Sequence, residues 1–165
     1  MSDPGPGASL RALVASAVDG DLSESSAPIA VAERGDDPGP GTRLADIAAG
    51  GDSIVGVVPR IDPSLARRVA DEVDGEARLV FTGSAGDRLA GPTGTAVRSA
   101  LSGRGVEAYR HGGDSPVGVL LVGDRAAVGL FDDRGLAAVL WSDAPRVREW
   151  AAATCRRFLA AADPV

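Results

Sequence analysis

Residues 116–142 read PVGVLLVGDRAAVGLFDDRGLAAVLWS and contain three apolar runs separated by two short polar segments. The runs cover residues 117–122, 126–131 and 136–141. The separating segments contain glycine and acidic residues, a composition typical of hairpin turns. We therefore expect the three runs to form an antiparallel meander.

Upstream of the meander, apolar strands alternate with helical patterns. The run at 54–58 is continuously apolar, as expected of a strand that is buried on both faces. A helix then begins at residues 62–63, with Leu65, Val69 and Val73 at four-residue spacing. Further strands are expected at 29–32, 77–82 and 106–109, and further helices after Thr42 and at 95–101. This alternation predicts a parallel, right-handed βαβ arrangement in the first part of the chain.

Helical patterns are also found near both ends of the chain. Residues 8–19 are predicted to form a short amphipathic helix, followed by a polar, serine-rich linker at 21–27. We therefore divide the chain into an N-terminal helix and linker, 1–28, and one α/β domain, 29–165. Towards the other end, Asp143 is expected to cap a long helix. The buried stripe of that helix comprises Val147, Trp150, Ala151, Thr154 and Phe158.

The charge composition restricts the partners of the chain. All 17 basic residues are arginine, 23 residues are acidic, and the net charge is −6. Net negative charge repels phosphate, so we expect no direct DNA binding by this chain. The absence of lysine, with abundant Ala, Gly and Asp, is typical of extreme halophiles, and a GC-rich genome is the alternative explanation.

Location can also be predicted from composition. No apolar run approaches the ~20 residues that a membrane helix requires, and the first residues do not resemble a signal peptide. The single cysteine, Cys155, permits no internal disulfide. We expect a cytoplasmic protein that makes no contact with a membrane.

Three segments together resemble one protein family. They are 54–65, IVGVVPRIDPSL; 116–135, PVGVLLVGDRAAVGLFDDRG; and 141–150, WSDAPRVREW. Their order and spacing are similar to those in the effector domain of archaeal, here haloarchaeal, winged-helix transcriptional regulators. That domain is named after the methanogenesis regulatory protein FilR and is related to the sugar-sensing TrmB regulators.

The resemblance covers roughly residues 29–165 and implies a fold and a function. The implied fold is a phospholipase D-like α/β sandwich: a parallel βαβ first part, an antiparallel meander and a C-terminal helix. The residues before Ile29 provide one short helix, which is too little for a winged helix. We therefore expect a sensor that lacks its own DNA reader and acts as a homodimer or through a DNA-binding partner.

Enzymatic chemistry is not expected on this scaffold. Phosphodiester cleavage would require paired His-x-Lys-x4-Asp motifs, with one His attacking phosphorus and the other protonating the leaving group. The chain has one histidine, His111, and no lysine. We therefore predict no catalytic residue, no cofactor and no metal.

Several other residues allow both a functional and a purely structural interpretation. Ser115 lies near His111 but lacks the following glycine of a nucleophile elbow. Residues 91–95 could present N–H groups to an anion, although a plain loop and helix cap also explains them. The adjacent Asp132 and Asp133 could form a metal or acid pair, but turn chemistry alone accounts for them.

The tryptophans and the cysteine are equally ambiguous. Trp141 and Trp150 suit sugar stacking, but the core is the more ordinary place for them in a chain with so few aromatic residues. Cys155 beside two arginines could be a thiol of lowered pKa, or a small buried residue of the helix.

Ligands of α/β sheets collect outside the carboxyl ends of the strands. That rule places a candidate ligand site at Pro59, Arg60, Thr82, Gly83, Ser84 and His111. Arg60 would be the clamp for an anion or hydroxyl, Ser84 would be a donor, and the effector would be a sugar or another metabolite. The alternatives are a structural dimerisation remnant without a ligand and an enzyme of unknown type.

Overall fold

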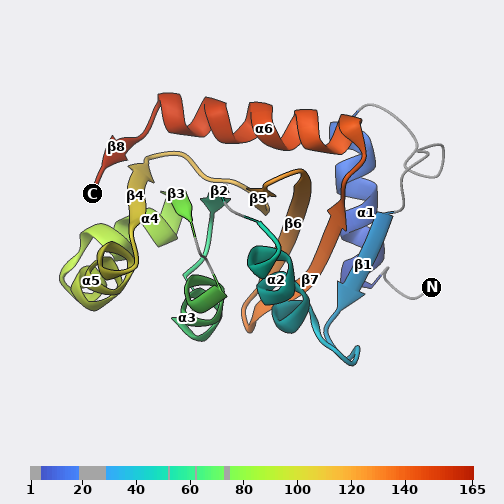
Figure 1. Ribbon diagram of the computed structural model, residues 1–165, viewed down its shortest axis with the longest axis horizontal. Helices are drawn as coiled ribbons and strands as arrows, with labels where there is room; N and C mark the ends of the chain where they lie inside the picture. Colours follow the sequence, from blue (N-terminus) through green and yellow to red (C-terminus); the bar gives the residue numbers. More distant parts are fainter. Residues whose placement is uncertain (1–4, 19–28, 52, 62, 73–74) are drawn as a thin grey trace.

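The fold is built on one mixed sheet of eight strands (Figure 1). A computed structural model describes residues 5–18, 29–51, 53–61, 63–72 and 75–165. The strand order is β1-β7-β6-β5-β2-β3-β4-β8. The mixed sheet and the helices between its strands confirm the expected α/β class. No helix within these residues is both long and apolar enough to cross a membrane.

Three neighbouring strands form the predicted parallel block. They are β2 (Ser53–Val58), β3 (Glu76–Thr82) and β4 (Val106–His111). In the parallel register, Val58 is opposite Phe81, and Thr82 is opposite His111. The block is connected by α3 (Pro63–Glu72), α4 (Gly83–Ala90), the short 3₁₀ helix η2 (Pro92–Gly94) and α5 (Thr95–Gly103).

The predicted meander is also present. It consists of β5 (Gly118–Val122), β6 (Arg125–Asp132) and β7 (Gly135–Ser142), each antiparallel to the next. Gly123 and Gly135 occupy the two turns with φ of 55° and 112°, which glycine adopts without steric strain. β5 pairs antiparallel with β2 and so joins the meander to the parallel block.

The first strand is not part of the parallel block, contrary to the sequence prediction. β1 (Ile29–Glu33) pairs antiparallel with β7 at one edge of the sheet, with Ile29 opposite Ser142. The chain then passes through α2 (Pro40–Ala49) to β2 near the middle of the sheet. Strand-helix alternation shows that a strand exists but does not identify its neighbour. At the other edge, the two-residue β8 (Asp163–Pro164) pairs with β4.

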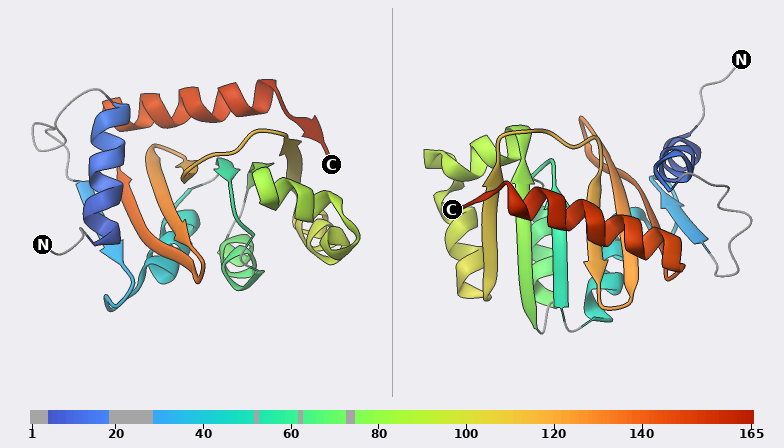
Figure 2. Two further views of the ribbon diagram at one scale, coloured as in Figure 1. Left: turned by 180° about the vertical axis from the view of Figure 1, so that it is seen from behind. Right: turned by 90° about the horizontal axis from the view of Figure 1, so that it is seen from above.

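Helices cover both faces of the sheet (Figure 2). On one face, α1 (Pro6–Ala17) packs on β1, β6 and β7, while α6 (Pro145–Ala160) crosses β2 to β6. The core beneath these two helices includes Leu10, Val14 and Val57. The helices α2, α3, α4 and α5 cover the opposite face.

Helix boundaries differ from the prediction in three places. Ala144, not the exposed Asp143, is the N-cap of α6, and this cap has no side-chain hydrogen bond among the described residues. The Ser142 hydroxyl oxygen instead accepts a hydrogen bond from the Ala144 N–H at 3.0 Å. The helix α2 begins at Pro40, two residues before the predicted cap Thr42, and α4 was not predicted.

The ends of other predicted elements agree less completely with the structure. The first helix ends at Ala17, and the predicted linker 21–27 lies outside the described residues, as do Asp62 and Val73 of the predicted third helix. The stripe of α6 is buried at Val147, Ala151, Thr154 and Phe158, and half-buried at Trp150.

Candidate functional site

The six predicted site residues lie at one edge of the sheet, where the parallel strands end. Pro59 and Arg60 follow β2, Thr82 ends β3, and His111 ends β4. Gly83 and Ser84 begin α4. Because β2, β3 and β4 are parallel and adjacent, their carboxyl ends lie at the same edge.

The sheet separates these residues into two groups. Side chains alternate between the faces of a strand, so Thr82 points away from the face of its neighbour Phe81. His111, the register partner of Thr82, packs edge-on against Phe158 of α6 with ring centroids 4.9 Å apart. Arg60 lines a cavity on the opposite face, between the sheet and the helices α2, α3 and α5.

The contacts of His111 join its ring to the loop after β4 and to α6. The Nδ1 atom accepts a hydrogen bond from the Gly113 N–H at 2.8 Å. In the neutral ring, the proton therefore lies on Nε2. With one nitrogen occupied and one side of the ring against Phe158, His111 fixes the loop that follows β4.

The turn at the end of β3 is tightly packed. Gly83 has φ of 54°, and its N–H donates to the Gly113 carbonyl at 2.7 Å. A Cβ atom at this position would lie 2.7 Å from the Asp114 Oδ1 atom. Thr82 is fully buried, and its Oγ1 has no hydrogen-bond partner among the described residues, whereas Ser84 is exposed.

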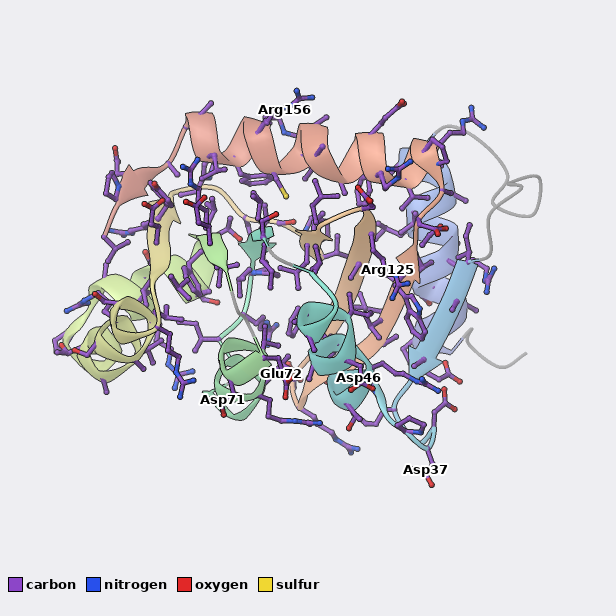
Figure 3. The ribbon with its side chains drawn as sticks, in the orientation of Figure 1. Asp37, Asp46, Asp71, Glu72, Arg125 and Arg156 are labelled. Atoms are coloured by element: carbon purple, nitrogen blue, oxygen red, sulfur yellow. The ribbon has the colours of Figure 1, made fainter. Side chains whose placement is uncertain are left out.

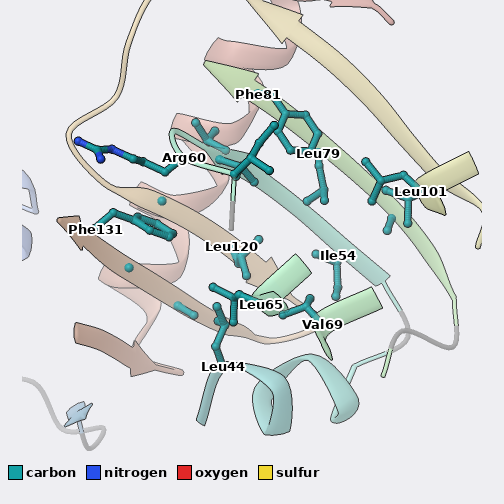
Figure 4. Close-up of a pocket in the computed structure, with 18 of the residues that line it drawn as sticks. Leu44, Ile54, Arg60, Leu65, Val69, Leu79, Phe81, Leu101, Leu120 and Phe131 are labelled. Carbon is teal, nitrogen blue, oxygen red and sulfur yellow. The ribbon is translucent and has the colours of Figure 1, made fainter. Parts of the chain in front are cut away.

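The cavity beside Arg60 has a volume of about 100 Å³ (Figure 4). Its floor is the sheet, and its walls are aliphatic side chains from three helices, such as Leu44, Leu65 and Leu101. Among the described lining residues, Arg60 is the only one with a charged side chain. The other five predicted site residues do not line the cavity.

Glycines leave room for an aromatic ring at one end of this cavity. Phe131, at the end of β6, lines the cavity together with Gly118 and Gly129. A Cβ atom at Gly118 would come within 3.0 Å of the Phe131 ring. In Figure 4 the stem of Arg60 lies above Phe131, and the guanidinium points outward from the apolar walls.

The helix α3 forms one wall of the cavity, and polar contacts of the described residues Arg68 and Asp71 join it to its neighbours. Arg68 Nη2 donates to Thr42 Oγ1 of α2 at 2.8 Å. Arg104, just after α5, forms an ion pair with Asp71 of α3. The apolar residues Leu65 and Val69, one helical turn apart, then lie against the cavity.

The charge of Arg60 is not neutralised by a described carboxylate. Its Nη1 donates to the backbone carbonyl of Asp132 at 3.4 Å, and no described acidic group lies within 4.0 Å. The carboxylate of Asp132 instead accepts two hydrogen bonds from Arg34, at 2.7 and 2.8 Å. That bidentate bond, with a further one from the Arg134 N–H, lowers the pKa of Asp132 to about 2.

The remaining candidates from the sequence have structural roles. Ser115 is buried and its hydroxyl donates to the Val117 carbonyl at 2.7 Å. Within the loop 91–95, the Thr95 hydroxyl donates a hydrogen bond to the Pro92 carbonyl at 3.1 Å. Burial raises the pKa of the Cys155 thiol to about 12, as expected of a small residue in the core. The described residues contain no group of three or more potential metal ligands.

The tryptophans belong to the two sides of the core. Trp150 packs against the cluster beneath α6, and Trp141 packs against the cluster on the opposite face. The guanidinium carbon of Arg43 lies 5.9 Å from the Trp141 ring centroid. Neither tryptophan lines the cavity beside Arg60.

Sequence reasoning missed the apolar walls of the cavity. The four-residue spacing of Leu65 and Val69 predicts only that these side chains share one face of a helix. The apolar run that contains Phe131 predicts only a strand of the meander. No pattern along the chain indicates that these side chains surround a cavity rather than fill the core completely.

Comparisons with known proteins agree with this architecture. Residues 39–161 match the family model described as "Methanogenesis regulatory protein FilR1, middle domain". No curated protein matches the chain.

Two solved structures have a similar fold. One is described as "Structure of TrmBL2, an archaeal chromatin protein, shows a novel mode of DNA binding". It has 12% identity and a TM-score of 0.60, covering 84% of this chain and 55% of that chain. The other is NucT from Helicobacter pylori, with 7% identity and a TM-score of 0.69, covering 85% of this chain and 100% of that chain. This chain therefore spans about half the length of the TrmBL2 chain.

Proposed function

The chain belongs to the family of the methanogenesis regulatory protein FilR1 middle domain, and from that premise we propose that it senses a small molecule without catalysing a reaction. The resemblance stated from the sequence is thereby confirmed, and the chain is a domain associated with transcription regulation. Ligand binding to this domain would then alter the activity of the transcriptional regulator to which the domain contributes.

The observation that carries the proposal is the cavity of about 100 Å³ beside Arg60. Protein interiors are close-packed, and few voids within them exceed the size of a water molecule. A bound molecule would restore the missing contacts.

The polar groups support binding over catalysis. His111 Nδ1 and the Ser115 hydroxyl already bond to the backbone, so neither group is poised to act on a substrate. Arg60 can bind and orient a ligand, but it cannot act as a base, because its guanidinium remains protonated.

The wider assignment follows the expectations from the sequence. We propose a phospholipase D-like scaffold over residues 29–165, preceded by the helix and linker of 1–28. The domain would work as a homodimer or through a partner that binds DNA. DNA binding is described for TrmBL2. Because this chain is only 12% identical to TrmBL2, the likeness supports a shared fold alone. The cytoplasmic location and the haloarchaeal origin remain predictions from the sequence.

A thermal-shift screen tests the sensing function. The panel contains neutral sugars, phosphosugars, apolar alcohols and small carboxylates. A ligand at 100 times its dissociation constant stabilises the folded state by about 2.7 kcal/mol, which raises the Tm of a chain of this size by roughly 5–10 °C. We expect at least one class of compound to produce such a shift.

Two substitutions of the same type locate the binding site. Val69→Phe places a ring in the cavity, whereas Val165→Phe adds the same ring at an exposed position. The Tm shift should disappear in Val69→Phe and persist in Val165→Phe. If no compound shifts the wild type, or if both variants respond like the wild type, the domain does not sense through this cavity. The first result would favour the dimerisation remnant.

A further inference from the structure

We propose that the cavity beside Arg60 binds a small apolar carboxylate, with the hydrocarbon part between the sheet and α3 and the carboxylate against the guanidinium. This inference rests on the proposed sensing function and specifies the chemical class of the ligand. It replaces the sugar or general metabolite expected from the sequence.

The size of the cavity limits the hydrocarbon part. An apolar cavity of about 150 Å³ in another protein stays dry and holds one benzene molecule. The cavity here, at about 100 Å³, is somewhat smaller. It therefore suits a phenyl ring after a small adjustment of the walls, or a chain of about four to six carbons.

The lining excludes a polar ligand body. The described walls are aliphatic or aromatic apart from Arg60, so they offer no side-chain hydroxyl, amide or carboxylate to a sugar. A sugar hydroxyl placed against Leu65, Leu101 or Leu120 would lose its hydrogen bonds to water without replacing them. Hydrocarbon makes no such demand and gains from leaving water.

The charge at the rim selects the head group. A guanidinium presents paired N–H donors that match the two oxygens of a carboxylate. Within the described ranges, Arg60 has one protein acceptor, the Asp132 carbonyl at 3.4 Å, so most of its donors are available. A single arginine matches a monoanion better than a phosphate, which carries nearly two charges.

The nearby acidic group does not oppose an anion at this position. Asp132 lies beside Arg60, but both of its carboxylate oxygens are bonded to Arg34. Its negative charge is thus paired before a ligand arrives. Arg34 therefore leaves Arg60 as the cation that the ligand meets at the end of the cavity lined by Phe131.

Three probe compounds separate the contributions of ring and charge. Phenylacetate has both groups, phenylacetamide has the same shape without the charge, and acetate has the charge without the ring. In isothermal titration calorimetry of the full chain, at about 0.1 M salt to limit screening, phenylacetate should bind at least about 10-fold more tightly than phenylacetamide. Acetate should bind far more weakly than either, and hexanoate should resemble phenylacetate.

Two arginine substitutions assign the charge effect. Arg60→Gln should weaken phenylacetate binding by about 10-fold or more and leave phenylacetamide unchanged. Arg156→Gln makes the same charge change on the outer surface of α6, where the side chain points away from the sheet (Figure 3), and should change neither affinity. Retained phenylacetamide binding also shows that Arg60→Gln is folded.

The outcomes distinguish this inference from the function on which it rests. Equal binding of phenylacetate and phenylacetamide, or unchanged phenylacetate binding by Arg60→Gln, would overturn the carboxylate inference and leave a sensor of neutral apolar molecules. A Tm shift that only sugars produce, abolished by Val69→Phe, would overturn it equally. If no compound in either experiment binds, the sensing function itself fails.

Discussion

Asp132 is the acidic residue on which the arrangement at the end of β6 depends. Its pKa is lowered to about 2 in the folded chain, chiefly by the hydrogen bonds from Arg34, from an ordinary value of 3.8. The ionised carboxylate therefore stabilises the fold fully above pH 3.8, and the stabilisation is lost as the pH falls from there to about 2. We expect Asp132→Asn to be less stable than the wild type at pH 7, with the difference shrinking below pH 3.8.

Urea unfolding across this pH range measures the difference. Asp133→Asn is the matched control, because Asp133 is exposed and has no ion pair among the described residues. It should follow the wild type at every pH. A gap between wild type and Asp132→Asn that stays constant down to pH 2 would show that the Arg34 bond does not stabilise the fold.

A side chain at Gly83, at the carboxyl edge of the sheet, would strain the backbone. Its φ of 54° disfavours an L residue, and an added Cβ would meet Asp114. We expect Gly83→Ala to lower the free energy of unfolding by about 1–2 kcal/mol or more. Gly103→Ala is the control, since no atom lies within 4 Å of its added Cβ. If both variants lower the urea midpoint equally, the turn at Gly83 does not specifically require glycine.

One of the six residues predicted from the sequence, Arg60, lines the cavity. The rule that ligands bind beyond strand ends correctly brought Arg60, Thr82 and His111 to one edge. It could not determine the face on which each side chain lies, since that depends on the register and on which helix covers which side. Arg60 and His111 accordingly have different surroundings.

At the level of elements, α1 is part of the core. Leu10 and Val14 are fully buried in the same cluster as Val57 and Val147, beneath α1 and α6. We therefore expect Leu10→Ala to cost about 2–5 kcal/mol of stability. Arg11→Ala, on the exposed side of the same helix, should change stability by less than about 0.5 kcal/mol. Equal urea midpoints for Leu10→Ala and Arg11→Ala would show that α1 detaches from the sheet.

The unpredicted helix α4 shows where local sequence is a poor guide. It reads GSAGDRLA, and two glycines in eight residues disfavour a helix by local propensity. Tertiary contacts outweigh this, because Ala85 and Leu89 are buried against the sheet. Arg110 of β4 also forms an ion pair with Asp87 at 2.7 Å. The Asp87–Arg110 pair joins residues that are 23 positions apart, so no local pattern contains it.

The meander was predictable because its signals are local. Alternating apolar runs and the short glycine turns around Gly123 and Gly135 specify hairpins within a few residues. The antiparallel pairing of β1 with β7 joins residues more than a hundred positions apart. The cavity is harder still to predict, since it depends on the spacing of three helices above the sheet.

For the molecule as a whole, the net charge of −6 disfavours binding to DNA, which is also negatively charged. Non-specific binding arises from cations that displace the counterions of phosphate, with dissociation constants of about 10⁻⁴–10⁻⁶ M. We expect this chain alone to bind duplex DNA more weakly than that range in a mobility-shift assay at about 0.1 M salt. A retarded complex at micromolar protein that prefers one sequence would contradict the proposed need for a DNA-binding partner.

The position of α6 has a consequence for biosynthesis. Residues 145–160 leave the ribosome after all of the strands that they cover, β2 to β6. Until then, α6 does not cover the sheet surface that contains Val57, Val119 and Val128, and this surface can contact other apolar surfaces. The nascent chain therefore exposes this apolar surface until residues 145–160 have emerged, and a chaperone that binds the surface would protect the chain from aggregation during that interval.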